Sequence, residues 1–125
     1  MRREAITQLA FERMVEEALA QVPAVYRRRM TNVVITVAAE PPQPGLLGLY
    51  EGRPLSERGA GEGFHLPDKI SIYRGPHLRM ARDRAHLRRV VAETLWHEIG
   101  HYFGMDEQQV ERAARRRTFG ARGLR

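Results

Sequence analysis

A long amphipathic segment at residues 83–103 constrains the fold of this chain more than any other feature. Apolar side chains recur along it at helical spacing, so one face must pack against a second layer of structure. That face consists of Leu87, Val90, Val91, Thr94, Leu95 and Ile99. Asp83 is a suitable N-cap, and Gly104 suits the left-handed residue that ends many helices. We therefore predict a long helix from Asp83 to Phe103.

Other periodic segments predict two more helices and a buried strand. Apolar residues at helical spacing indicate a first helix over residues 4–22, which Pro23 ends, and a short final helix over residues 106–117. The β-branched run at residues 32–39 is too short for a helix and is typical of a buried strand.

The middle of the chain predicts extended segments and a loop. Residues 46–50 read as a second strand or extended segment, and the glycines at 59–63 predict a mobile loop. Apolar and polar residues alternate at 69–74, as in an exposed or edge strand, and Gly75 and Pro76 close it. The element order predicts an α+β domain, with one small mixed sheet covered by helices.

Length and composition narrow the class of protein. A chain of 125 residues suits a single domain spanning residues 1–125. It has no cysteine, so any metal must be held by histidine nitrogens and carboxylate oxygens. No run of about 18 apolar residues occurs, and the N-terminal segment lacks a secretory apolar core. We expect a soluble, cytoplasmic protein with no membrane partner.

The formal net charge of +6 and the sequence pI of about 10.7 would suit an anionic partner such as a nucleic acid. Lysine, however, occurs only at Lys69, and the arginines are spread along the chain in short clusters. We expect an arginine-rich solvated surface and no dedicated nucleic-acid site.

The predicted long helix carries the sequence His97-Glu98-Ile99-Gly100-His101. His97 and His101 are separated by four residues, so both imidazoles project from one helix face and can converge on one ion. Glu98 sits about 100° further around the helix, where it can accept a proton from a water at the metal without ligating it. By chance the five-residue motif arises in roughly 2% of chains of this composition, so chance is a weak explanation.

A third metal ligand is needed from outside this helix. If the helix stops at Gly104 and the chain turns, Glu107 returns toward the two histidines and completes a His₂Glu set. Asp106 is the alternative ligand, or else the N-cap of the last helix. Glu111 lies too close in sequence to His101 to act as a distant third ligand.

The remaining candidate residues have simpler interpretations. His65 and His77 flank the predicted edge strand and are expected to be surface residues, and His86 is too far along the helix from His97. Trp96 is expected in the core. Gly100, costly within a helix, indicates close approach by a neighbouring strand.

The segment His97–Glu107 resembles the H-E-x-x-H-x-x-G-x-x-H signature of metzincins, and the matrixin version most closely. The chain is more similar still to a family of small bacterial zincin-like proteins, long described only as a domain of unknown function, whose third ligand is acidic. This resemblance extends over residues 46–56 and 67–76.

The resemblance implies a minimal zincin-like fold and a zinc cofactor. By position, His97, His101 and Glu107 become the zinc ligands, Glu98 the general base and Gly104 the turn residue. It also implies a zinc-dependent metallopeptidase acting on a peptide or protein substrate. In zincins an edge strand pairs with the substrate, and residues 70–74 are the candidate for that role, or else an ordinary sheet edge.

Two alternatives remain open. Metzincins carry a methionine-containing turn beyond the site, and no methionine follows Glu107 in this chain. This departure favours a second hypothesis, a zincin-fold protein that binds metal or a partner without turnover. An arginine-rich nucleic-acid binder is a third, motivated by charge alone.

Overall fold

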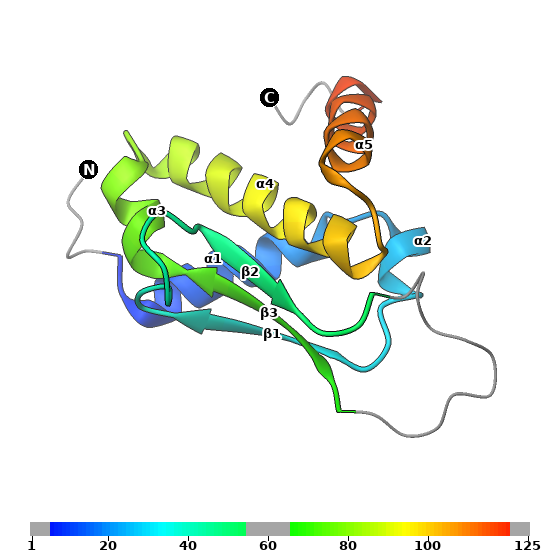
Figure 1. The fold of residues 1–125 in the computed structure, drawn as a ribbon. Helices are drawn as coiled ribbons and strands as arrows, with labels where there is room; N and C mark the ends of the chain where they lie inside the picture. The colour runs from blue at the N-terminus through cyan, green and yellow to red at the C-terminus, as the bar shows by residue number, and fades with distance from the viewer. Residues whose placement is uncertain (1–5, 55–65, 121–125) are drawn as a thin grey trace.

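The computed structural model describes residues 6–54 and 66–120 and confirms the predicted α+β class (Figure 1). The elements are α1 (Gln8–Ala20), α2 (Ala24–Arg27), β1 (Val33–Ala38), β2 (Gly48–Glu51), β3 (Asp68–Tyr73), α3 (Arg74–Met80), α4 (Arg84–Tyr102) and α5 (Glu107–Gly120). The loop predicted at residues 59–63 and His65 lie outside the described residues.

The long helix α4 matches its prediction closely. The Asp83 carboxylate accepts a hydrogen bond from the His86 N–H at 2.8 Å, so Asp83 is the N-cap. Every residue of the predicted packing face is buried. Trp96 is also buried, with its ring edge-on to Tyr26 at a centroid distance of 5.2 Å, as expected of a core residue.

The sheet has the order β1-β3-β2 within the described residues, with β1 parallel and β2 antiparallel to β3. The prediction of an edge strand at residues 69–74 is therefore wrong, because β3 is the central strand. Ser71 and Tyr73, the outward positions of the alternating pattern, are each only 4% exposed. A small hydroxyl and an aromatic ring tolerate burial, so the alternation of residue types did not reflect exposure.

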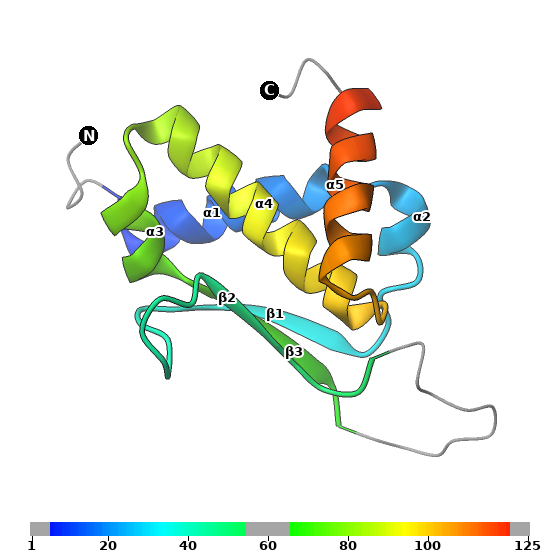
Figure 2. The same cartoon turned by 45° about the horizontal axis from the view of Figure 1, so that its top comes forward.

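The helices α1, α3 and α4 lie on one side of this sheet (Figure 2). Side chains from α1, β3 and α4 meet between the two layers and form the core. Its members include Phe11, Met14, Val15, Ile70, Ile72, Leu87, Val91, Leu95 and Ile99. Along residues 6–54 and 66–120, no helix combines the length and apolar character needed to cross a membrane.

The strand β3 ends at Tyr73, just before Gly75 and Pro76, as predicted. These two residues lie in the first turn of helix α3, which accommodates proline. This helix carries His77 into the core, so the prediction of a surface histidine is wrong. Its Nδ1 lies 2.6 Å from the Tyr73 carbonyl oxygen and its Nε2 lies 2.9 Å from Thr94 Oγ1. Because a carbonyl only accepts, Nδ1 carries the proton and Nε2 accepts from the Thr94 hydroxyl.

Candidate metal centre

His97 and His101 lie one turn apart on α4, near its C-terminal end. Their ring centroids are 4.8 Å apart and their planes are inclined at 80°. The two side chains are 37% and 29% exposed, so both rings are reachable from solvent. The four-residue spacing therefore brings both imidazoles to one accessible patch of the helix, as predicted.

The chain turns sharply after α4 at Gly104, whose φ is +85°. The Gly104 N–H donates to the His101 carbonyl at 2.9 Å, and the Met105 N–H donates to the Gly100 carbonyl at 3.0 Å. These two bonds form a Schellman motif, which favours glycine at its left-handed position. The turn residue predicted from the sequence is confirmed.

The next helix, α5, begins immediately beyond this turn. The Gln109 N–H donates to the Asp106 carboxylate, and the Asp106 N–H donates to the Gln109 side chain, each at 2.8 Å. This reciprocal pair is a capping box, so Asp106 is the N-cap of α5 and Glu107 is its first residue.

The N-terminal end of α5 packs directly on α4 at Gly100. A Cβ added to Gly100 would lie 2.5 Å from Val110 Cγ2. Close approach at Gly100 was predicted correctly, but its partner is a helix and not a strand. The absence of a side chain at Gly100 lets α5 sit close enough for Glu107 to reach the two histidines.

The Glu107 carboxylate meets both histidines. Its Oε1 lies 3.2 Å from His97 Nε2 and 3.1 Å from His101 Nε2, and the three candidate donor atoms lie within 4.8 Å of one another. Ligand atoms about 2.0–2.1 Å from a tetrahedral zinc ion stand roughly 3.3 Å apart, so the two distances from Glu107 to the histidines fit. The donor types fit as well, because two histidines and a glutamate are a recurring catalytic zinc set.

Glu98 projects to the side of this cluster, toward the sheet, and is 7% exposed. Its Cγ would lie 3.1 Å from a Cβ added to Gly48 of β2. Burial raises the pKa of Glu98, while the charges of His97 and His101 and a hydrogen bond from the Tyr50 backbone N–H act in the opposite direction. The carboxyl group therefore sits beside the histidines with its pKa above the ordinary value.

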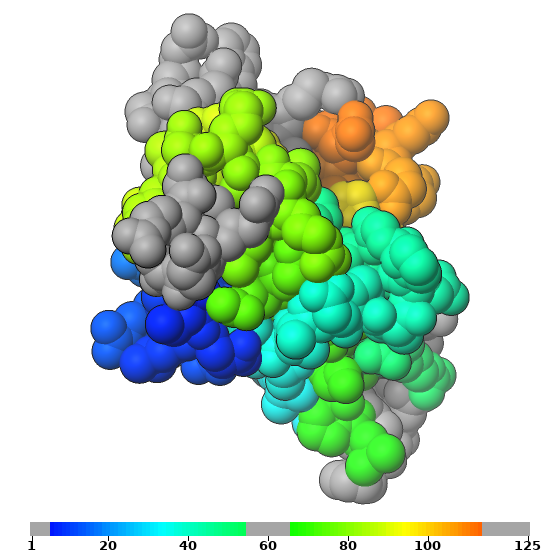
Figure 3. Space-filling model, turned by 90° about the vertical axis from the view of Figure 1, so that its left-hand side faces the viewer, coloured from blue at the N-terminus to red at the C-terminus, as the bar shows by residue number. Residues whose placement is uncertain are grey.

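A cleft of about 540 Å³ opens over these residues, between the end of α4 and strand β2. Its polar wall contains His97, Glu98, His101 and Glu107, and its other wall is formed by β2 and its flanking residues. In Figure 3, α5 (orange) and the cyan-green segment leading into β2 lie side by side at the surface, with a small part of α4 (yellow) between them.

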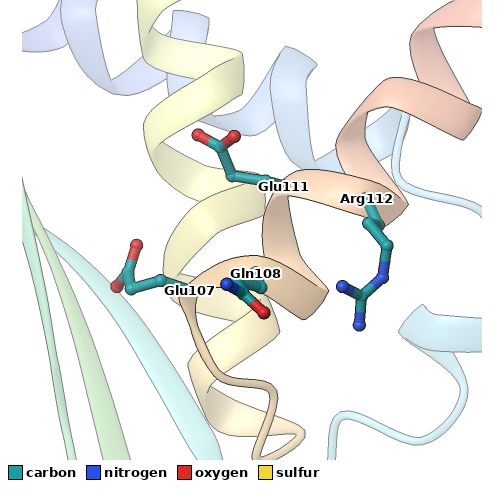
Figure 4. Close-up of a pocket in the computed structure, with 4 residues that line it drawn as sticks. All are labelled: Glu107, Gln108, Glu111 and Arg112. Carbon is teal, nitrogen blue, oxygen red and sulfur yellow. The ribbon is translucent and has the colours of Figure 1, made fainter.

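Glu107 also lines a second cavity of about 420 Å³ on α5, together with Gln108, Glu111 and Arg112. Figure 4 shows the Glu107 side chain directed away from α5 and Arg112 directed to the opposite side. Glu111, one turn further along, is not part of the three-residue cluster found among the described residues.

The residues on the β2 side of the cleft, which we call the strand wall, were not predicted from the sequence as part of the site. Gly48 leaves room for Thr94 and Glu98, since an added Cβ would lie 2.7 Å and 3.1 Å from their side chains. Glycine within a strand was the available signal for such close approach. Tyr50 and Asp68 meet at 2.6 Å only because β2 pairs with β3, and no local pattern indicates that contact.

This fold and this cluster define a small zincin-type domain with a candidate His₂Glu metal centre. The chain matches the family of zincin-like metallopeptidases over residues 19–116 and belongs to that family. It is similar to a conserved hypothetical protein of known structure from Thermus thermophilus. The two are 32% identical with a TM-score of 0.57, covering 78% of this chain and 94% of the other. No curated protein sequence matches the chain.

Proposed function

We propose that this protein is a zinc-dependent peptidase in which His97, His101 and Glu107 hold the metal and Glu98 is the general base. The observation that carries this proposal is the Glu107 carboxylate, which lies within 3.2 Å of both histidines while Glu98 lies beside them in the same cleft. Membership of the zincin-like metallopeptidase family supports it.

A zinc ion bound there would supply a Lewis acid that polarises the scissile carbonyl and acidifies water. Glu98 would accept the proton of the attacking water and deliver it to the leaving amine. Its burial favours this exchange, because a raised pKa brings a carboxyl group closer to the neutral range in which it both takes up and releases a proton.

The substrate would lie along the free edge of β2, in place of the β3 segment predicted from the sequence. Leu47 and Tyr73 face each other as a hydrogen-bonded pair, so along β2 the N–H and C=O groups of Gly48 and Tyr50 point away from β3. The Tyr50 N–H bonds to Glu98. The outward groups of Gly48 and the Tyr50 carbonyl are then positioned to bind an extended peptide.

The apolar residues of the cleft suit a substrate with an apolar side chain near the scissile bond. Leu46, Leu49, Pro54 and Met105 all line the cleft and are half-buried. A bulky apolar side chain would displace water from this surface, which stabilises binding by about 25 cal/mol per Å².

A metal-binding or partner-binding protein without turnover is the second candidate. Residues 108–125 contain no methionine, so none of them forms the methionine turn of the metzincins, and this favours the second candidate.

The deciding experiment combines zinc stoichiometry with hydrolysis of a peptide library. We expect one zinc per chain, and cleavage that Glu98→Gln reduces by about 10²- to 10⁴-fold, as expected for loss of a general base. Glu93→Gln, an exposed glutamate on the same helix, is the matched control and should cleave like wild type. Stoichiometric zinc without cleavage that depends on Glu98 would favour the second candidate, and absence of metal binding would exclude both.

A further inference from the structure

We propose that Asp68 is a positioning residue which, through Tyr50, holds the strand wall of the cleft so that the Tyr50 backbone N–H stays on Glu98. This inference rests on the proposed peptidase function of Glu98. It concerns a buried carboxylate that lies outside the metal cluster and outside the cleft lining.

Asp68 is the first residue of β3 and is 2% exposed. Its Oδ2 accepts a hydrogen bond from the Tyr50 hydroxyl at 2.6 Å, and its Oδ1 accepts one from the Arg53 backbone N–H at 3.3 Å. A carboxylate at this depth requires such donors, because burying it without them is costly. Both bonds come from β2 or the residues that follow it, so Asp68 ties the end of the edge strand to the central strand.

The chain leaving β2 is folded tightly around this carboxylate at Gly52. Gly52 has a φ of +154°, and a Cβ added to it would lie 2.3 Å from Asp68 Cγ. A residue with a side chain would therefore both strain the backbone and collide with Asp68. The local sequence is fitted to bring Asp68 against β2.

Tyr50, which is hydrogen-bonded to Asp68, also contacts α4 in two ways. Its ring lies edge-on to Tyr102 at a centroid distance of 6.1 Å. Tyr102 is in turn fixed, because its hydroxyl donates to the Thr31 carbonyl at 2.7 Å and accepts from the Thr31 N–H at 3.1 Å. The Tyr50 backbone N–H, which points away from β3, donates to the Glu98 carboxylate.

The positioning effect follows from how little strand pairing holds the end of β2. The strand has four residues and pairs on one side only, with β3, within the described part of the chain. A strand this short has few ladder bonds, so its end is free to fray without a further anchor. With Asp68 in place, the Glu98 carboxylate stays bonded to the strand at the wall of the cleft.

The test uses zinc-loaded Tyr50→Phe and Asp68→Asn, with Glu51→Gln as the matched control. Glu51 lies on the same strand but is exposed, and its carboxylate forms a 3.9 Å ion pair with Lys69. The amide proton at position 50 is observed by NMR. Loss of its bond to Glu98 should shift this resonance upfield and speed its hydrogen exchange about tenfold in both variants, but not in the control.

The second measurement is of the kinetic constants and the zinc affinity. We expect kcat to fall roughly fivefold to tenfold in both variants, the equivalent of one hydrogen bond, with KM and zinc affinity within about twofold of wild type. A purely structural role for Asp68 would lower the melting temperature and leave the amide resonance and kcat unchanged, which would overturn the proposal.

Two further comparisons separate this proposal from a folding defect and from failure of the proposed function. If Asp68→Asn fails to fold, Tyr50→Phe alone decides, since it removes one hydroxyl and keeps the ring against Tyr102. If Glu98→Gln shows that no cleavage depends on Glu98, the proposed function fails, while the position-50 amide proton still reports whether Asp68 positions Glu98.

Discussion

The helical wall of the cleft comes from one continuous segment, residues 97–107, whereas the strand wall, residues 46–54, is held in place by a residue of another strand. In the helical wall, a helix turn, a Schellman motif and a capping box succeed one another and place Glu107 on His97 and His101. In the strand wall, Tyr50 reaches Asp68 only through the pairing of β2 with β3. The first wall should therefore respond to local substitutions, and the second to changes in packing.

The largest effect on the helical wall should come from removing Glu107, the proposed third ligand. Glu107→Ala should weaken zinc binding by more than about 100-fold, since losing a ligand costs more than the roughly 10- to 100-fold typical of a supporting residue. Competition with a chromophoric chelator measures this. Glu111→Ala, one turn along α5, is the control, and an equal loss there would contradict the assigned ligand set.

The strand wall should be most sensitive to substitution at Gly48. A Cβ there would lie 2.7 Å from Thr94 Cγ2 and 3.2 Å from the Ser71 carbonyl oxygen. Neither group moves easily, so Gly48→Ala should lower the free energy of unfolding by about 1–3 kcal/mol. Chemical denaturation checks this, and a variant as stable as wild type would show that α4 does not cross β2 so closely.

Gly104 offers the corresponding test in the helical wall. Its φ of +85° disfavours any residue with a Cβ, so Gly104→Ala should cost about 1–2 kcal/mol of stability and weaken zinc binding together. Gly45→Ala is a useful comparison, because Gly45 has a φ of +90° with nothing within 4 Å of an added Cβ. Both should lose stability, and only Gly104→Ala should lose zinc affinity.

The smallest effect concerns pH and His77, which lies between the two layers. Burial lowers the pKa of His77 below its ordinary value of 6.5, so the unfolded chain takes up a proton at a higher pH than the folded one does. The stability that neutral His77 contributes is complete above pH 6.5 and is lost as the pH falls through 6.5 toward its folded pKa. Thermal unfolding of wild type and His77→Gln across this range should show a shallower acid loss in the variant.

The helical wall was predictable because its signals are local. Asp83, Gly104 and the four-residue histidine spacing each act within a turn or two of the chain, and all three predictions were confirmed. Asp106 is the N-cap, which is one of the two roles that the sequence allows, and this assignment also depends on a neighbour three residues away.

The strand wall was not predictable in the same way. The alternation at 69–74 describes residue types, but which strand becomes central depends on pairing with β1 and β2, which no local pattern encodes. His77 was misplaced for a related reason, since its partner Thr94 lies seventeen residues away on another helix. The partner of Gly100 was likewise a helix from beyond the turn, where a strand was expected.

Zinc X-ray absorption of the loaded protein would show whether two histidines and one glutamate of this chain form the proposed zinc site. We expect one zinc per chain, with two imidazole nitrogens at about 2.0–2.1 Å and the remaining ligands oxygen at about 2.0–2.2 Å. A site with any other number of imidazoles, or a chain that retains no zinc, would contradict it.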